Sequence, residues 1–265
     1  MSLARSAAVL TLLLGSWSVL SGEAAEDQGK RVVDEALEAL GGQKFLNMHT
    51  RSSSGRIHSF FRDQMNGLDI AHIYTEYPNS HEKGALGIRE RQVLGKKQDY
   101  SFLFLEKQGW DITFRGARPV DPDRWDKYAR TTENDILYIL KLRHDEPGMS
   151  YDFVGSQVYL SRHVEIVELT DLASRTVRVY FDHNTRLPLR QIFSWLDPET
   201  KYRNEEITEY DKFRDIGGGV MWPFTVERQR NGYKSYQFFA DSVQVNGSMP
   251  PKIFELPAGA KTLHP

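Results

Sequence analysis

Residues able to do catalytic chemistry form no recognisable catalytic motif in this sequence. It contains no Gly-rich phosphate loop, dinucleotide glycine fingerprint, nucleophile elbow or His-Glu-x-x-His zinc helix. It has no cysteine, which excludes thiol nucleophiles, iron–sulfur clusters and a lipid-modified cysteine. The eight histidines are scattered, with no pair at ligand spacing on a predicted helix. We therefore expect no metal, no cofactor and no catalytic residue; the enzymatic alternative is a hydrolase site with His72 or His163 beside a carboxylate from a distant strand.

Two acidic segments deserve comparison with known site patterns. Asp121 to Asp126 begins like a calcium-binding loop but lacks the glycine that such a loop needs, so we expect an exposed acidic turn. Glu205 and Glu206 are adjacent in a predicted strand, where neighbouring side chains point to opposite faces. They therefore cannot act as a carboxylate pair.

The remaining binding candidates are apolar. Aromatic and aliphatic residues form rows on several predicted strands, and a predicted helix adds two more residues. Core residues and cavity walls are of the same types, so this pattern is compatible with a packed core or with the wall of a hydrophobic cavity. The candidate cavity residues are Phe102, Phe104, Trp110, Ile112, Phe114, Ile136, Leu140, Phe193, Trp195, Trp222 and Phe224.

The elements that must position these residues are mainly strands. Residues 174–245 read as five consecutive extended segments separated by turns, which predicts an antiparallel meander. The last turn is Asn231-Gly232, a pair that accepts the positive φ angles of a type I′ hairpin. Further strand-like segments precede the meander, and between residues 100 and 107 both faces are apolar, so both should be buried.

Two helical elements interrupt the strands. Residues 27–40 have apolar residues at helical spacing and end at Gly41-Gly42. Residues 119–130 are expected to form a loop, and Thr131 or Thr132 to cap a helix that runs to about Arg143. With about ten to eleven strands, a long antiparallel sheet tends to curl, and the two helical elements could cover its concave face as in an open or incomplete barrel.

Composition and the N-terminal segment limit the classes to which this protein can belong. The chain has 265 residues, 40% hydrophobic residues and a net charge of -2, typical of a globular protein without general attraction to nucleic acid. Residues 7–20 are almost wholly apolar, shorter than the roughly 20 residues of a membrane span, and small residues follow. We interpret residues 1–24 as a signal peptide cleaved near Ala24, residues 25–257 as one β domain, and residues 258–265 as a tail.

Four short segments resemble one family. They are residues 39–42 (ALGG) at the end of the first helix, 179–182 (VYFD), 187–190 (LPLR), and 254–257 (FELP) near the end. With the leader and the long meander, they make the chain similar to the outer-membrane lipoprotein-sorting carriers of the LolA/LolB-like superfamily. The resemblance implies a curved, incomplete barrel, lidded by helices, with an apolar cavity for acyl chains. The arginine that helps to hold the lid in the carrier has no recognisable counterpart here.

The sequence thus favours a periplasmic, non-enzymatic protein that binds a lipid, a lipoprotein acyl chain or another hydrophobic ligand. It would remain soluble after removal of the leader and could have a partner among envelope proteins. The main alternative is an envelope interaction or structural module, which would have no cavity and would expose a contiguous patch.

Overall fold

The computed structural model describes residues 24–79, 82 and 84–257. The predicted signal peptide, apart from its last residue, and the predicted tail lie outside the described residues. Four helices are present in this part of the chain: α1 Ala25–Ala39, α2 Gln43–Leu46, α3 Pro122–Glu133 and α4 Ile136–Leu142. The strands are β1 Thr50–Phe61, β2 Gln64–Glu76, β3 Arg89–Leu94, β4 Tyr100–Phe104, β5 Gly109–Thr113, β6 Gly116–Pro119, β7 Ser150–Tyr159, β8 Arg162–Thr170, β9 Thr176–Asp182, β10 Pro188–Leu196, β11 Arg203–Asp215, β12 Met221–Arg230 and β13 Tyr233–Val245.

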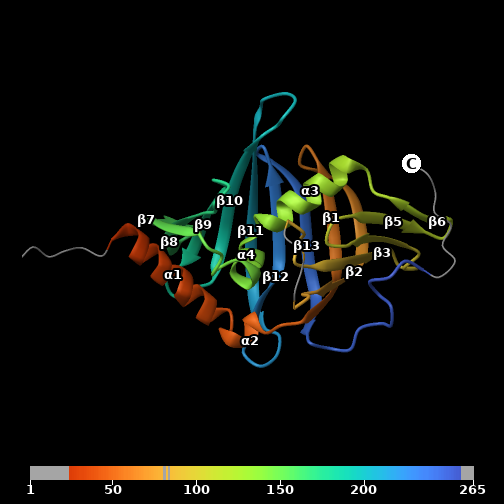
Figure 1. Ribbon diagram of the computed structural model, residues 1–265, viewed down its shortest axis with the longest axis horizontal. Helices are drawn as coiled ribbons and strands as arrows, with labels where there is room; N and C mark the ends of the chain where they lie inside the picture. The colour runs from red at the N-terminus through yellow and green to blue at the C-terminus, as the bar shows by residue number, and fades with distance from the viewer. Residues whose placement is uncertain (1–23, 80–81, 83, 258–265) are drawn as a thin grey trace, which may run out of the picture.

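All of these strands belong to one antiparallel sheet of thirteen strands (Figure 1). Their order is β6-β5-β4-β3-β2-β1-β13-β12-β11-β10-β9-β8-β7, so the sheet is open between its edges β6 and β7 in the described part of the chain. This confirms the predicted mainly β, open and curved architecture. The strand number exceeds the expected ten to eleven partly because β6, with four residues, is too short to show alternation.

The five predicted meander strands are β9 to β13, each hydrogen-bonded to the next. Asn231 and Gly232 have φ angles of 51° and 81°, as a type I′ hairpin requires. The meander returns the chain to the middle of the sheet, where β13 pairs with β1 and Arg51 lies opposite Val245. The first and last strands of the described chain are therefore neighbours.

The inserted helical segment differs from the prediction. The expected loop over residues 119–130 contains α3, which begins at Pro122, where the fixed φ of proline suits the first helical turn. The expected single helix from residue 131 is instead interrupted after Glu133. Asp135 then caps α4, since its side chain accepts hydrogen bonds from the backbone N–H of Leu137 at 2.9 Å and Tyr138 at 3.4 Å. The prediction missed α3 because its residues are mostly polar and none is fully buried.

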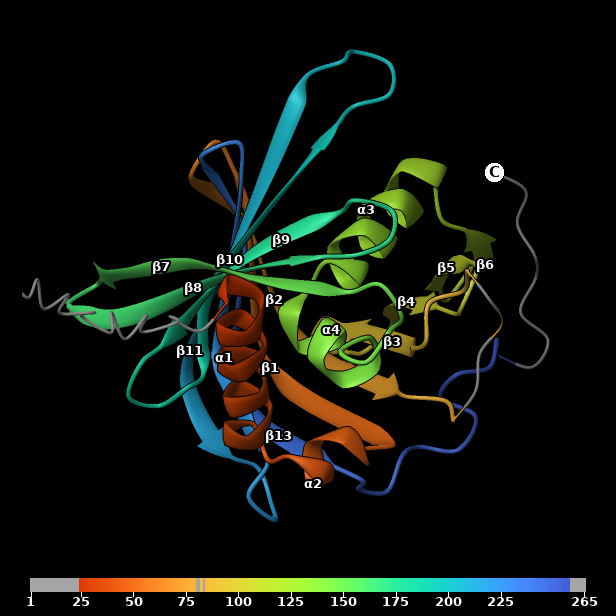
Figure 2. The same cartoon turned by 60° about the vertical axis from the view of Figure 1, so that its left-hand side comes forward.

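The helices cover the concave face of the sheet (Figure 2). One continuous core joins α1 and α4 to the inward-facing rows of β7 to β12. Gly29 lets α1 approach β7 closely, because a Cβ there would lie 2.2 Å from the carbonyl oxygen of Tyr151. No helix within the described ranges combines the length and the apolar character needed to cross a membrane.

A second apolar cluster lies on the other face of β4 to β6. Leu103, Ile112 and Ala117 form it, and Trp110 and Phe254 pack against it. Because Phe102 and Phe104 are also buried, both faces of β4 are covered, as the apolar pattern of residues 100–107 predicts.

Candidate functional site

A cavity of about 370 Å³ lies between the concave face of the sheet and the helices α3 and α4. Its walls come from β1 to β4 on one side, from β11 to β13 on the other, and from the two helices above. The volume falls in the lower part of the roughly 300–1,000 Å³ range of small-molecule sites. The cavity is therefore large enough for one small ligand.

Aromatic rings form one wall of this cavity. Phe102 and Phe104 on β4 lie with ring centroids 6.1 Å apart. Tyr128 of α3 stacks on Phe104 at 3.7 Å, with the planes 8° apart. This contact attaches α3 to the sheet through ring surfaces, which form an apolar part of the cavity wall.

The cavity also contains buried charge, which the sequence reasoning missed. Arg51 of β1 donates to Ser53 Oγ at 3.1 Å and to Thr75 Oγ1 at 2.9 Å, and its guanidinium lies 4.5 Å from the Trp222 ring centroid. Glu90 Oε2 is 3.8 Å from an Arg51 nitrogen. This part of the wall is a polar network in which the buried Nε of Arg51 has no hydrogen-bond partner among the described residues.

On β12 the signal for a buried charge was present in the sequence. Trp222, Phe224, Val226 and Arg228 have the same strand parity, so an arginine continues an inward-facing apolar row. Arg228 lines the cavity and lies 3.9 Å from Asp135. A charged residue that ends an apolar row is therefore the sequence signal that marks this site.

The junction of α3 and α4 is fixed to the sheet by Gln191 of β10. Its amide oxygen accepts from the backbone N–H of Ile136 at 2.6 Å, and its amide nitrogen donates to the carbonyl of Asn134 at 2.9 Å. Tyr210 of β11 donates to Gln191 Oε1 at 2.7 Å and to Asp135 Oδ2 at 3.0 Å. Burial, followed by the nearby Asp135 carboxylate, raises the pKa of Tyr210 well above its usual value. Its hydroxyl therefore stays protonated and holds the junction as a donor.

The other cavity tyrosines are also kept neutral. Burial raises the pKa of Tyr236 to about 12 and raises that of Tyr77 above its ordinary value. The described lining includes no histidine, serine or cysteine. The cavity thus offers apolar surface, hydroxyl groups and fixed charges, an arrangement suited to binding.

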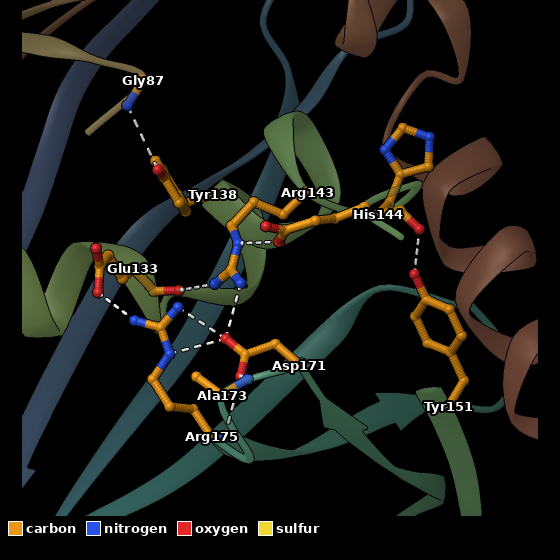
Figure 3. Close-up of polar contacts among 10 residues, drawn as sticks. Gly87, Glu133, Tyr138, Arg143, His144, Tyr151, Asp171, Ala173 and Arg175 are labelled. Atoms are coloured by element: carbon orange, nitrogen blue, oxygen red, sulfur yellow. Dashed lines mark hydrogen bonds and ion pairs between the residues drawn. The ribbon is translucent and has the colours of Figure 1, made fainter. Parts of the chain in front are cut away.

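A polar network attaches the far end of the helical cover to the β8–β9 turn (Figure 3). Arg143, at the end of α4, donates to Asp171 at 2.8 Å and to the carbonyl of Glu133 at 3.3 Å. Arg175 donates to Asp171 at 2.7 Å and to Glu133. We call Glu133, Arg143, Asp171 and Arg175 the helix clamp. A recess of about 500 Å³ beside it is lined in part by charged groups, of which Arg143 pairs with Glu146 and Arg175 with Glu133.

The predicted cavity residues fall into several places. Phe102, Phe104 and Trp222 line the cavity. Ile136, Leu140, Phe193 and Phe224 are buried in the main core, and Trp195 packs against it between the guanidinium groups of Arg130 and Arg230.

The rest of the predicted set lies on β5 and its hairpin. Ile112 and Trp110 belong to the cluster on the other face of the sheet. Phe114 is 82% exposed, because β5 ends at Thr113 and Phe114 lies in the turn that follows. The alternation of residues 110, 112 and 114 therefore stops before its last member.

The two histidines named for the hydrolase alternative lie outside the cavity lining. His72 lies on β2 and His163 on β8, and neither lines the cavity. No group of three or more His, Cys, Asp or Glu side chains in the described ranges is arranged to hold a metal ion.

Comparison with known proteins gives no match to a protein-family model and no match to a curated protein. Solved structures do match. An outer membrane lipoprotein-sorting protein domain from Vibrio parahaemolyticus has a TM-score of 0.55 and 9% identity, over 86% of this chain and 97% of that one. A DUF1329 family protein from Desulfovibrio piger has a TM-score of 0.59 and 11% identity, over 88% and 99%.

A LolA superfamily protein from Nitrosomonas europaea is also similar, with a TM-score of 0.50 and 11% identity over 85% of this chain and 96% of that one. At such low identity these matches establish the fold. The resemblance to the lipoprotein-sorting superfamily that the sequence indicates is confirmed at that level.

Proposed function

We propose that the protein is a carrier of the bacterial envelope that binds a lipid, an acyl chain or another hydrophobic ligand in the cavity under α3 and α4. The observation that carries the proposal is the cavity of about 370 Å³ enclosed by the concave sheet and the helices. Its aromatic wall and the absence of histidine, serine and cysteine from the described lining suit binding better than catalysis. The similar folds of lipoprotein-sorting proteins support the same function.

Binding of this kind needs no reactive group. Burial of each methylene yields roughly 0.8 kcal/mol, so an apolar chain in a cavity of suitable shape is held by its surface alone. Aromatic walls such as Phe102 and Phe104 provide that surface at little conformational cost. A carrier also requires access to the cavity, and the helical cover is the element that would provide it.

The proposed location is the periplasm. Its basis is the apolar leader of residues 7–20, with cleavage near Ala24. Removal of this leader would leave a chain whose described helices begin at Ala25.

The alternative of an envelope interaction module has one observation in its favour. Phe61, Met65 and Leu68, on the β1–β2 hairpin, are 65%, 59% and 58% exposed. Such a group of exposed apolar side chains at a hairpin end is typical of a contact surface. If this surface is the functional one, replacing Phe61 and Met65 by serine leaves apolar ligand binding unchanged. The variant then fails to restore the function lost in a strain from which the gene has been deleted.

A cavity-filling substitution tests the carrier function. Val226 lines the cavity and is half-buried, so Val226→Trp should occupy the space that a ligand needs. We expect the variant to bind the apolar fluorophore N-phenyl-1-naphthylamine at least about tenfold more weakly than the unchanged protein, a loss of about 1.4 kcal/mol. Val158→Trp, on exposed β7, is the matched control. Equal binding by all three proteins, or no binding by any, would contradict the proposal.

A further inference from the structure

The charged residues that line the cavity are unevenly matched. The whole chain has a net charge of -2, yet the cavity has more cations than carboxylates. Its cationic side chains are Arg51, Arg124, Lys127 and Arg228, and its carboxylates are Glu90 and Asp135. Because a cavity lined by more cations than carboxylates attracts anions, this excess points to a negatively charged group on the ligand.

Both carboxylates already have partners. Asp135 Oδ1 caps α4, and Asp135 Oδ2 accepts from Tyr210 at 3.0 Å. Glu90 accepts from Gln92 at 2.7 Å and from Thr75 at 3.2 Å. Both carboxylates therefore accept hydrogen bonds from other groups, and two carboxylates do not neutralise the four cationic side chains of the cavity.

Arg228 is the least exposed of the cavity cations whose side chains make no hydrogen bond to the described residues. Its side chain makes no hydrogen bond to any of the described residues, and its buried Nε is unpaired. Its nearest carboxylate oxygen is 3.9 Å away on Asp135, beyond hydrogen-bonding distance. The ring of Tyr236 lies 5.1 Å from the guanidinium and holds it in place. Since 29% of the side chain is accessible and the residue lines the cavity, its free donors are available there.

Arginine and lysine residues on α3 face the same space. Arg124 and Lys127 are three positions apart, on one side of the helix, and both line the cavity. The protein around Lys127 displaces water and lowers its pKa, and the guanidinium groups of Arg230, Arg228 and Arg124 lower it further. Glu206 acts in the opposite direction, but its carboxylate accepts from Thr131 at 3.0 Å and it does not line the cavity.

The aromatic wall lies around Phe102 and Phe104 of β4, where the guanidinium of Arg124 is 4.5 Å from the Phe102 ring centroid. Arg228 belongs to β12, whereas Phe102 and Phe104 belong to β4, five strands away in the order of the sheet. Both strands line the same cavity because the sheet curves beneath the helices. The cavity thus separates Arg228 from the aromatic wall, an arrangement suited to the head group and the chain of an amphiphile.

We propose that the ligand is an amphiphile with an anionic head group, a carboxylate or a phosphate. Arg228 and Lys127 donate to the head group, and the chain lies against Phe102 and Phe104. The inference rests on the proposed carrier function and adds the chemical class of the ligand.

Matched ligands test the head group by isothermal titration calorimetry with the whole protein. Dodecanoate and dodecyl phosphate have the anion, and 1-dodecanol has the same chain without it. We expect at least one of the anions to bind about tenfold or more tightly than the alcohol, since a charged hydrogen bond adds appreciably to affinity. Acetate and inorganic phosphate, which lack the chain, should bind at least about 100-fold more weakly than the matching amphiphile.

Two charge variants test the residues. Arg228→Gln should remove most of the preference for the anion and leave the affinity for 1-dodecanol unchanged. Lys127→Gln, on an accessible helix surface, should act in the same direction without affecting the fold. Lys252→Gln is the control, because that lysine is 77% exposed and does not line the cavity.

The outcomes separate the two proposals. If the alcohol binds as tightly as both anions, or if neither variant changes the preference, the head-group assignment is overturned while the carrier function stands. If free phosphate binds as tightly as dodecyl phosphate, the site is one for the bare anion, and the amphiphile assignment fails. If no ligand with a chain binds, the carrier function itself fails.

Discussion

Lys141 is the buried ammonium group of the helical cover. It is 8% exposed, its Nζ donates to the carbonyl of Leu46, and it lies 5.0 Å from the ring centroid of Tyr77. Burial lowers its pKa to about 8. The folded protein therefore favours the neutral amine more strongly than the unfolded chain does.

This shift gives a pH dependence with a definite sign. Between the folded pKa of about 8 and the ordinary value of 10.5, the unfolded chain binds more protons, so the free energy of unfolding should rise with pH. After allowance for partial solvent screening, we expect about 1–2 kcal/mol from this residue between pH 8 and pH 10. Urea unfolding of the unchanged protein and of Lys141→Met at several pH values measures it.

The comparison isolates Lys141 because the buried tyrosines are present in both proteins. Their raised pKa values make a contribution that is lost only as pH rises above about 10. Parallel stability profiles for the two proteins would show that Lys141 has no depressed pKa.

Single residues also show what the sequence could reveal about the site. Phe102, Phe104 and Trp222 were predicted as candidates and line the cavity, because alternation on a strand is a local property. Arg51, Glu90 and Asp135 were not, because their burial depends on pairing between residues distant in the sequence. Phe114 fitted the alternation but lies beyond the end of its strand.

At the scale of elements, two polar networks are among the contacts that attach the helix pair α3–α4 to the sheet. Gln191 and Tyr210 fix the junction between the helices, and the helix clamp fixes the junction and the end of α4 to the β8–β9 turn. Asp171 is the centre of the clamp, since Arg143 and Arg175 both donate to it. Its pKa is lowered, because these partners outweigh the opposing effect of burial.

Removal of the Asp171 carboxylate should therefore loosen the cover. Asp171→Ala removes one carboxylate partner of Arg143, whose side chain is only 14% exposed and which keeps Glu146 as a partner. We expect a loss of about 2–3 kcal/mol in the free energy of unfolding, below the roughly 3–5 kcal/mol of a fully buried pair because Arg175 is 40% exposed. Relative to the unchanged protein, Asp171→Ala should increase the rate of hydrogen exchange more in α4 than in β12.

The exposed pair between Arg178 and Glu168 provides the control. Its side chains are 46% and 31% exposed, so Glu168→Ala should cost at most about 1 kcal/mol. If Asp171→Ala costs no more than this control, the helix clamp does not hold the cover.

The predictability of the elements depended on local signals. Alternation and the Asn231-Gly232 turn were enough to predict β9 to β13, because each signal depends only on residues that are close together in the sequence. The boundary between α3 and α4 was missed, because Thr131 and Thr132 also suit a helix cap and the prediction continued one helix through Asp135, which is the cap of α4.

At the scale of the whole molecule, the topology explains why a cavity forms. The chain leaves the sheet at the edge strand β6 and re-enters at the opposite edge, β7. The connecting segment must therefore pass across the sheet, and it does so over the concave face as α3 and α4 (Figure 2). A curved sheet and two short helices leave the space of about 370 Å³ between them. The sequence predicts the curl and the helical cover, whereas the size and polarity of the space follow from long-range pairing.

Native mass spectrometry tests the central claim most directly. The chain would be expressed with its leader, purified from the cell envelope, and weighed intact before and after organic extraction. The account predicts a mass above that of the polypeptide by one bound molecule, released by extraction in stoichiometric amount and absent from Val226→Trp. A bare polypeptide mass, unchanged when a hydrophobic ligand is added in excess, would contradict it.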